Sequence, residues 1–411
     1  MAAISEILDV ESDVHYYNDI INFEYHTHGP YANQKLERSD EVRIPINSMD
    51  HYCLPCRSFL LIEGQVDCRR DVKDDKSDVV TETTATYKLI SNAMSYLFDE
   101  IRYELAGTSI AKSRLVGITS TIKALLLKNS FDKNIFHLAG FDHDGYTLTD
   151  NKFSFCIPLK LILPFFEDFK HVILNLKQEL VLLRSSSDIN CIESANGKKV
   201  SITLTKLVWK MPYIELENHR RLKFLKILDA DRPLKLAFRK WEIHEYPVLP
   251  LSKEHSWTIR TTSIADIPKY VILAFQTNRK LIMKANMAKF DFCQLHNVKL
   301  YLNSQYYPYD HFLGSKELMY KTFLDFAVSY YNLPVNAEYG NAVDFNTFKS
   351  ETPIFVIDCS HQSDHLKVST DVRVEIEFEK AVPNLTTAYC ILVSDTLIEY
   401  KPLTSLVREV Q

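Results

Sequence analysis

Residues 372–379 constrain the fold most strongly, because polar and apolar side chains alternate along them without a break. Successive side chains of a β-strand point to opposite faces of a sheet, so this period of two predicts a strand with one face in a core and the other in solvent. Residues 100–105 show the same alternation. The predicted core positions of these two strands are Val374, Ile376, Phe378, Ile101, Tyr103 and Leu105.

Many other short segments are rich in β-branched and aromatic residues and lie between turn signals, as strands do. These predicted strands are residues 41–46, 59–66, 200–205, 234–238, 256–260, 270–276, 298–302, 353–357 and 387–393. Predicted helices are few, namely Asn218–Asp229, with Asn218 as the N-cap, and residues 318–331. The regular strand–helix alternation of a parallel sheet is absent. The pattern therefore predicts an all-β fold with few helices, of the sandwich or jelly-roll kind.

The length of 411 residues favours two or three domains. Residues 1–40 show no sustained period, and we interpret them as an N-terminal arm that orders against a partner. The strand-rich remainder divides near residue 217 into two halves of similar length, 41–217 and 218–411, which is compatible with two copies of one architecture. Asn196-Gly197 is the strongest signal for a two-residue hairpin turn.

Composition disfavours several classes of protein. Phosphate-binding loops need glycine, and the chain has only nine glycines, so a nucleotide-dependent enzyme is disfavoured. The net charge of −5 argues against a protein built to contact nucleic acid. No apolar run is long enough to span a membrane, and the acidic N-terminus does not resemble a signal peptide. We therefore expect a cytosolic or nuclear chain whose eight cysteines are free thiols.

Two motifs have the spacing of partial metal sites. Cys53 and Cys56 form a Cys-x-x-Cys pair, which is half of a zinc site or a redox motif, but no second pair follows. His26 and His28 would lie on one side of an extended segment, and nothing nearby in the sequence completes a site. We interpret the first pair as strand-edge thiols and the second as loop histidines, and predict no metal ligand.

Residues 142–145 begin like a calcium-binding loop, with carboxylates alternating before Gly145. The bidentate glutamate that such a loop requires is missing, because Asn151 occupies its position. We interpret the segment as a turn, because Asp and Gly tolerate left-handed backbone geometry.

A cluster near residue 360 contains every residue type of a nucleophilic triad, with Asp358, Cys359 and His361 followed by Asp364 and His365. Catalytic groups are positioned by the fold from different loops, so proximity in sequence is weak support. No Gly-x-Ser-x-Gly motif occurs in the chain. The preferred interpretation is a polar connection between strands, so we predict no catalytic residue and no cofactor. An enzyme that uses Cys359, His361 and Asp358 is a further alternative, and we rank it last among the possible functions.

Residues 219–226 are basic and amphipathic. Such a segment can bind nucleic acid or an acidic partner. Because Asp229 and Asp231 dilute the charge directly after it, we interpret it as a surface helix packed against the protein by its leucines.

Several segments, taken in their order along the chain, resemble the double jelly-roll major capsid proteins of double-stranded DNA viruses. The similarity is greatest to the short versions in Polinton-like and adintovirus-like elements, including endogenous copies in invertebrate genomes. It covers roughly residues 40–400, and Leu105-Ala106-Gly107 stands where typical relatives have Leu-Asn-Gly. The segments that carry it are residues 97–107, 114–121, 153–159, 269–277, 300–304 with Tyr307-Pro308, and 355–360.

The resemblance implies two tandem eight-stranded antiparallel jelly rolls and a structural, non-enzymatic role without a cofactor. Three chains would form a pseudo-hexagonal homotrimeric capsomer through interfaces on the order of thousands of Å² per chain, and capsomers would tile an icosahedral shell. The expected partners are copies of the chain and minor or penton capsid proteins, without a membrane span or specific nucleic-acid contact. The expected location is the virion capsid, assembled in the host nucleus or cytoplasm. The arm would order against neighbours or the inner surface.

The sequence is also compatible with a second class of function, a binding protein. A protein with two β-sandwiches can recognise a glycan or another protein through aromatic loop residues such as Tyr306, Tyr307 and Tyr309. This class includes a capsid-derived gene that a host has adopted.

Overall fold

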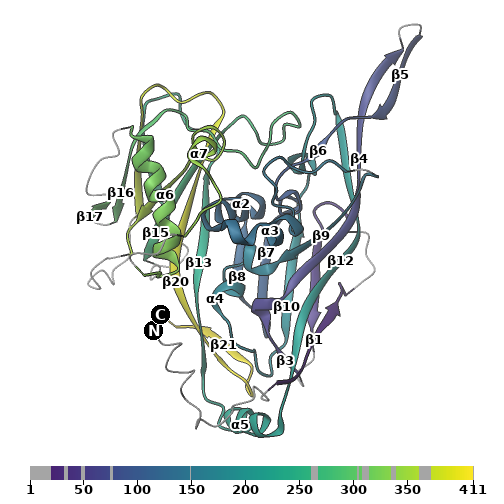
Figure 1. Cartoon of the computed structure of the whole chain (residues 1–411), viewed down its shortest axis with the longest axis vertical. Coiled ribbons are helices and arrows are strands. Elements are labelled where there is room, and N and C mark those ends of the chain that lie inside the picture. Colours follow the sequence, from purple (N-terminus) through teal and green to yellow (C-terminus); the bar gives the residue numbers. More distant parts are fainter. Residues whose placement is uncertain are drawn as a thin grey trace, which may run out of the picture.

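The computed structural model describes residues 20–31, 36–47, 51–74, 77–148, 150–260, 267–302, 305–307, 314–334, 339–360 and 372–410. The strands of the two halves of the chain form separate sheets that stand side by side (Figure 1). Every strand pair among the described residues is antiparallel. The prediction of an all-β fold with few helices, arranged as tandem jelly rolls, is confirmed.

The first jelly roll has two main sheets, and both are antiparallel. One has the order β1-β12-β4-β5, with β3 beside β12 and β9 beside β4, and the other has the order β2-β10-β7-β8. A short pair, β6 and β11, lies apart from them. The bounds are β1 (Ile20–His28), β2 (Glu41–Ile46), β3 (Tyr52–Cys53), β4 (Phe59–Asp74), β5 (Ser77–Thr84), β6 (Lys88–Leu89), β7 (Phe98–Leu105), β8 (Thr108–Arg114), β9 (Lys152–Pro158), β10 (Gln178–Arg184), β11 (Ile192–Glu193) and β12 (Lys199–Leu216).

The second jelly roll repeats this two-sheet arrangement. One sheet has the order β13-β20-β15-β18, with β21 beside β20, and the other has the order β14-β19-β16-β17. The bounds are β13 (Leu234–Tyr246), β14 (Glu254–Ile259), β15 (Pro268–Thr277), β16 (Leu295–Leu302), β17 (Gln305–Tyr307), β18 (Ile354–Asp358), β19 (Val372–Phe378), β20 (Thr386–Lys401) and β21 (Leu406–Glu409).

The alternating strands bury the faces that their sequences predict. Ile101, Tyr103 and Leu105 of β7 are fully buried, and so is Val374 of β19. Ile376 and Phe378 are at most 2% exposed. The alternation arises because one face of each sheet meets the opposite sheet and the other face meets solvent.

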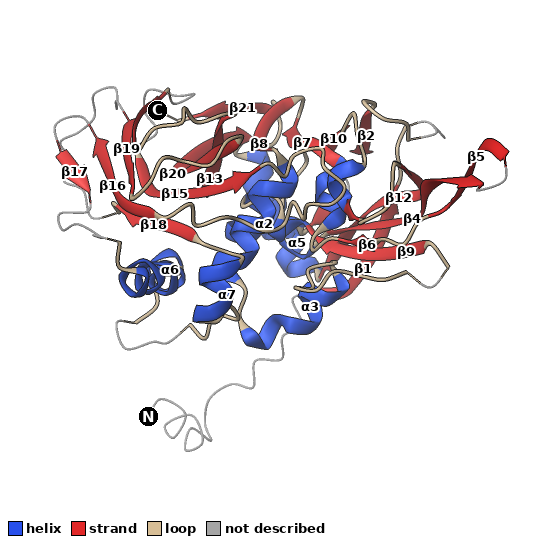
Figure 2. Cartoon of the chain, turned by 90° about the horizontal axis from the view of Figure 1, so that it is seen from above, coloured by secondary structure: helices blue, strands red, loops and turns tan. Residues whose placement is uncertain are grey.

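Helices lie between and beside the strands. The buried helix α2 lies between the two jelly rolls (Figure 2) and contacts α6, which confirms the helix predicted at residues 318–331. The bounds are α2 (Val116–Leu127), α3 (Lys133–Leu138), α4 (Phe165–Asp168), α6 (Lys316–Tyr330) and α7 (Phe345–Ser350).

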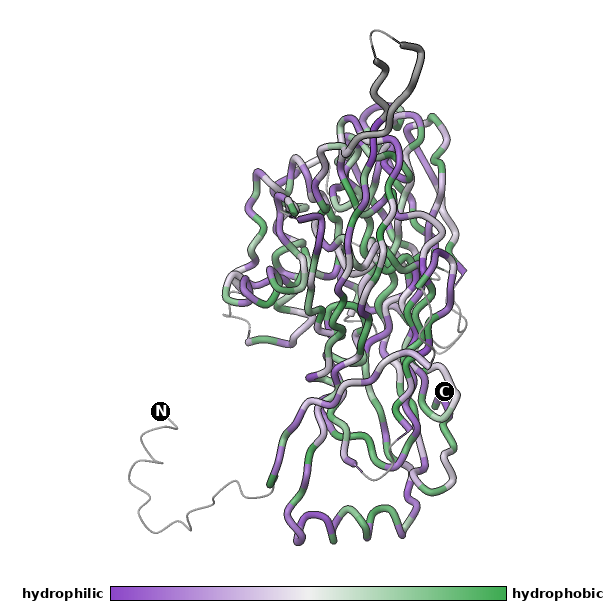
Figure 3. The backbone as a smooth tube through the Cα atoms, turned by 90° about the vertical axis from the view of Figure 1, so that its right-hand side faces the viewer, coloured by the Kyte–Doolittle hydropathy of each residue, from purple (hydrophilic) through white to green (hydrophobic). Residues whose placement is uncertain are grey.

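Helix α5 (Asn218–Asp229) joins the jelly rolls and forms the lower end of the molecule (Figures 1 and 3). Its N-cap is Glu217 rather than the predicted Asn218, because the Glu217 carboxylate accepts the backbone N–H of His219. The interpretation that its leucines pack against the protein is wrong, since Leu222 is 60% exposed and Leu225 is 47% exposed. Phe224 is half-buried against Tyr52.

The Asn196-Gly197 hairpin prediction is also wrong. The strand before these residues, β11, pairs with β6, whereas β12 pairs with β4. Gly197 instead packs closely against Cys68, because a Cβ atom at this position would lie 2.9 Å from the Cys68 Sγ. Its N–H donates to the Ser194 Oγ at 2.9 Å.

The predicted irregular arm contains a regular strand. Residues 20–28 form β1, which pairs with β12 of the same chain from Ile20–Leu216 to His28–Trp209. The pairing partner expected from a neighbouring molecule is therefore supplied within the chain for this stretch. Residues 1–19 and 32–35 lie outside the described residues.

The two jelly rolls share one continuous apolar core. Polar contacts cross between them at several heights, including Tyr96 Oη to the Met287 carbonyl at 2.8 Å and Asn129 Nδ2 to the Tyr339 carbonyl at 2.9 Å. Because both apolar burial and hydrogen bonds span the contact, we treat the two jelly rolls as one structural body.

Candidate functional site: a groove on the first jelly roll

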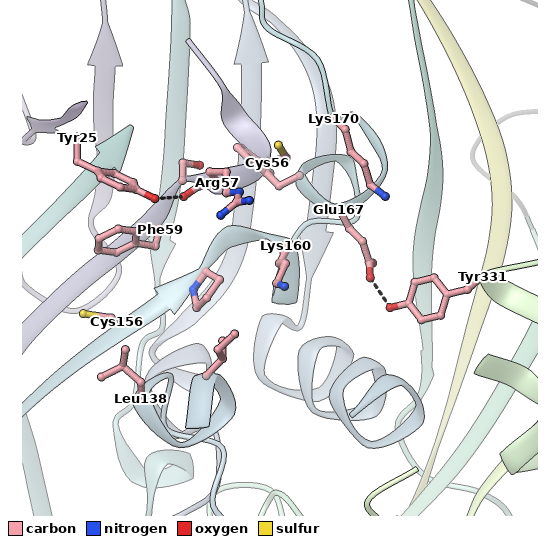
Figure 4. Close-up of a pocket in the computed structure, with 14 residues that line it drawn as sticks. Tyr25, Cys56, Arg57, Phe59, Leu138, Cys156, Lys160, Glu167, Lys170 and Tyr331 are labelled. Carbon is pink, nitrogen blue, oxygen red and sulfur yellow. Dashed lines mark hydrogen bonds between the residues drawn. The ribbon is translucent and has the colours of Figure 1, made fainter. Parts of the chain in front are cut away.

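A groove of about 810 Å³ opens on the side of the first jelly roll (Figure 4). It is lined by β1, the short 3₁₀ helix Pro55–Arg57, the adjacent ends of the paired strands β4 and β9, and the helices α3 and α4. Its lining includes Tyr25, Arg57, Phe59, Leu138, Lys160 and Lys170.

One wall of the groove is apolar. The Tyr25 and Phe59 rings lie 5.5 Å apart, and Tyr25 also contacts Phe23 edge-on. Across the groove, α3 contributes Ile135 and Leu138, which are 42% and 57% exposed. Clustered exposed apolar side chains of this kind mark binding surfaces more often than isolated ones do.

The rim of the groove is cationic. Arg57, Lys160 and Lys170 line it, and none of them has an ion-pair partner within the part of the chain that the structure describes. The Tyr25 hydroxyl points to the Arg57 carbonyl at 3.5 Å (Figure 4). The groove therefore presents positive charge next to apolar surface.

Glu167, the one acidic residue of the groove lining, is paired with Lys123, which lies outside the lining. Its carboxylate accepts the Tyr331 hydroxyl at 2.6 Å and pairs with the Lys123 ammonium at 2.8 Å. Burial alone would raise the pKa of Glu167, but Lys123 and Tyr331 more than offset this effect, and the pKa is lowered. Glu167 thus stays ionised and paired, which leaves the charge of the groove to its three cations.

The Cys-x-x-Cys residues separate into different environments. Cys53 is buried in β3, and burial raises its pKa to about 12. Cys56 lines the groove together with Cys156, and burial raises the pKa of both thiols. Redox and metal-binding cysteines need lowered pKa values, so these environments do not favour either chemistry.

The two histidines lie on strand β1 rather than in a loop, which corrects the interpretation of them as loop histidines. The His26 ring stacks on Tyr213 at 4.2 Å, and His28 Nε2 lies 3.2 Å from the Tyr213 hydroxyl. Burial and the neighbouring His26 lower the pKa of His28 to about 4. Within the described residues, no three His, Cys, Asp or Glu side chains are grouped to hold a metal ion.

The triad-like cluster is only partly described. Cys359 is 1% exposed, and its thiol donates to the Pro268 carbonyl at 3.2 Å. Asp358 accepts the Ser329 hydroxyl at 2.7 Å. His361, Asp364 and His365 lie outside the described residues.

Two other sequence motifs have ordinary structural environments. Residues 142–145 form a turn in which Gly145 has a φ of +71°, and His143 Nε2 lies 3.0 Å from the Glu351 carboxylate. Tyr306 is 46% exposed and Tyr307 is half-buried on the edge strand β17, whereas Tyr309 lies outside the described residues.

Sequence reasoning missed the groove. Its residues come from β1, β4, β9, α3, α4, two short 3₁₀ helices and the chain after α4, so no local motif joins them. Strand β1 supplies one wall, and it lies within the segment 1–40 that we predicted to be an irregular arm. The available signal was the alternation of Phe23 and Tyr25 with polar neighbours, which is typical of a strand.

The double jelly roll-like domain family matches residues 87–398, and the chain belongs to this family. No curated protein matches it in sequence. Among solved structures, a chain of the Sputnik virophage is similar with a TM-score of 0.66 at 9% identity, over 98% of this chain and 91% of that one.

Two structures named as major capsid proteins are also similar in fold. The Faustovirus protein has a TM-score of 0.60 at 8% identity, over 97% of this chain and 94% of that one. The mavirus protein has a TM-score of 0.58 at 10% identity, over 98% and 92%. At these identities the likeness establishes the fold. Among the described residues, no helix is long and apolar enough to cross a bilayer.

Proposed function

We propose that this chain is a viral, or virus-derived, major capsid protein of the Polinton-like and adintovirus-like kind. It trimerises into pseudo-hexagonal capsomers, which assemble an icosahedral shell. The observation that carries the proposal is the extent of the fold match. The chain and the capsid proteins that it resembles cover each other over more than nine tenths of their lengths.

The architecture supports this role. Two jelly rolls with one shared core form a single building block, so three copies would place six jelly rolls around an axis. Exposed apolar residues outside the groove, among them Leu251 and Leu406, provide surface whose burial favours assembly. The proposed units are residues 41–217 and 218–411, with the segment 1–40 contributing β1 to the first sheet.

The proposed partners are copies of the chain and minor or penton capsid proteins. The proposed location is the virion capsid, assembled in the host nucleus or cytoplasm. The role is structural, so the chain needs no catalytic residue, cofactor or metal.

The test is assembly of the expressed chain on its own. We expect native mass spectrometry to give a trimer or larger species, and negative-stain microscopy to show hexagonal capsomers or particles. A stable monomer at high concentration that binds a glycan array through Tyr306 would contradict the proposal and favour a binding module.

A further inference from the structure

The negative charge of the chain is concentrated at one end. Residues 1–19 contain no Lys or Arg, and their five acidic residues equal the formal net charge of −5 of the whole chain. The rest of the chain therefore carries equal numbers of acidic and basic residues. The acids of this segment are Glu6, Asp9, Glu11, Asp13 and Asp19.

The same segment is also apolar. Ile4, Ile7, Leu8, Val10 and Val14 are interspersed with its acids. A ligand of this composition fits a site that offers cations beside apolar surface, because each kind of group then meets its complement.

The groove offers that combination next to the point where the segment leaves the described structure. Ile20 begins β1 opposite Leu216, and Tyr25, five residues along the same strand, lines the groove. This separation is about 17 Å along a strand. Nineteen residues can span about 60 Å when extended, so the segment is long enough to return to the groove. Its tethering gives it a high effective concentration there.

We propose that the groove binds residues 1–19 of its own chain. The acids pair with Arg57, Lys160 and Lys170, and the apolar residues cover Tyr25, Phe59 and Leu138. The proposal accounts for three cations without ion-pair partners among the described residues, and for apolar side chains left exposed around one groove.

Helix α5 is the competing basic surface, and the observations favour it less. Glu215, Glu217, Asp229 and Asp231 flank its basic residues in the sequence. The groove is concave, and its lining contains one acid, which is already paired with Lys123.

Native thiols make the proposal testable by disulfide trapping. Cys56 and Cys156 line the groove, so an Ile7→Cys variant of the full chain, oxidised with glutathione disulfide, should form an intramolecular disulfide with one of them. Peptide mass mapping identifies the pair. Leu403→Cys is the control, because residue 403 is 55% exposed and lies in the turn between β20 and β21, outside the groove lining.

Charge reversal tests the recognition itself. In the Ile7→Cys background, Lys160→Glu with Lys170→Glu should reduce the disulfide yield about tenfold, since attraction becomes repulsion at two positions. Adding Glu6→Lys and Asp9→Lys should restore it. Both lysines are partly or fully exposed, so the fold should persist, and circular dichroism checks this.

Amide hydrogen exchange gives a second readout without any substituted cysteine. Residues 135–138 and 57–59 should exchange about tenfold more slowly in the full chain than in a chain that lacks residues 1–19. Protection of α5 instead, a disulfide between two chains, or no disulfide from Cys placed at positions 4, 7, 10 and 14 would overturn the proposal.

This inference and the capsid proposal fail separately. Intact capsomers without the disulfide would refute only the groove inference. A disulfide-trapped chain that stays monomeric would refute only the capsid proposal.

Discussion

At the residue scale, Glu167 joins the two jelly rolls through a buried charge network. It lies in α4 of the first jelly roll, accepts the hydroxyl of Tyr331 from the second, and pairs with Lys123 of α2. The Lys123 ammonium also donates to the Lys160 carbonyl at 2.6 Å. Removal of one member of such a network leaves the opposite charge buried without compensation.

Glu167→Gln should therefore lower the free energy of unfolding by about 3 kcal/mol at neutral pH. The pKa of Glu167 in the folded protein lies below its usual value of 4.5, so its contribution to stability is present above that pH. As the pH falls through the folded-state pKa, protonated Glu167 comes to resemble Gln and the difference between wild type and variant should shrink. Denaturant titrations at a series of pH values from 7 downward measure this.

The matched control replaces both charges by apolar side chains of similar size. Lys123→Met with Glu167→Leu removes the unpaired charge and should be much less destabilising than Glu167→Gln. Equal losses in the two variants, or a loss independent of pH, would exclude the ion pair as the cause.

Val374 tests the facing of the alternating strand β19. Its side chain is fully buried, so Val374→Asp places an unpaired carboxylate in the core and should cost about 4 kcal/mol or more. Expression in the soluble fraction and thermal melting measure the loss. Glu377→Gln on the exposed face of the same strand is the control and should change little. Normal assembly of Val374→Asp would contradict the facing.

At the scale of elements, α5 illustrates how a connection can carry apolar residues that the chain itself does not cover. The helix begins after the Glu217 cap and spans the lower end between β12 and β13. The Phe224 side chain of α5 contacts the first jelly roll through the Tyr52 ring. Exposed leucines contribute little to folding, because their burial is small.

Leu222→Ser with Leu225→Ser should consequently leave the free energy of unfolding within about 0.5 kcal/mol of wild type. Chemical denaturation measures the change. The control is Leu236→Ser in the adjoining strand β13, where the side chain is fully buried and the loss should be several-fold larger. A large loss from the α5 variant would mean that its leucines do pack against the protein.

Elements with one buried face were predictable from their period, and buried strands such as β15 were predictable from their β-branched and aromatic residues, whereas the buried helix α2 was not predicted. Strand β19 and strand β7 alternate because solvent meets one of their faces. Helix α2 is buried almost all round, so its sequence has no polar stripe from which a helical period could be read. Strand β1 is exposed on both faces, so the alternation of Phe23 and Tyr25 with Asn22 and Glu24 does not mark a face buried in the core.

At the scale of the whole molecule, Arg239 of β13 ties the second jelly roll to the first. Its guanidinium forms a bidentate pair with Asp168, also donates to the Tyr330 carbonyl, and stacks on the Tyr330 ring at 3.4 Å. The Arg239–Asp168 pair crosses between the jelly rolls beside their shared apolar core. Cooperative unfolding of the two jelly rolls follows from this continuity.

Calorimetry should therefore show one transition for the wild-type chain. Arg239→Ala leaves the Asp168 carboxylate without its partner and should lower the free energy of unfolding by about 3 kcal/mol. It should also separate the melting of the two jelly rolls. Arg239→Lys keeps the charge but loses the bidentate geometry, so its effect should be intermediate. Two transitions in the wild type would show that the jelly rolls unfold independently.

The sequence by itself determined the class of fold, the facing of the alternating strands and the presence of helices α5 and α6, which both have a solvent-exposed face. These follow from local periodicity, which depends only on which side chains meet water. The tertiary structure alone decided the partner of β1, the exposure of the α5 leucines and the groove between β1 and α3. Tyr25, Lys160 and Lys170 are far apart in the chain, and only the folding of distant strands and helices onto one another brings them to a single site.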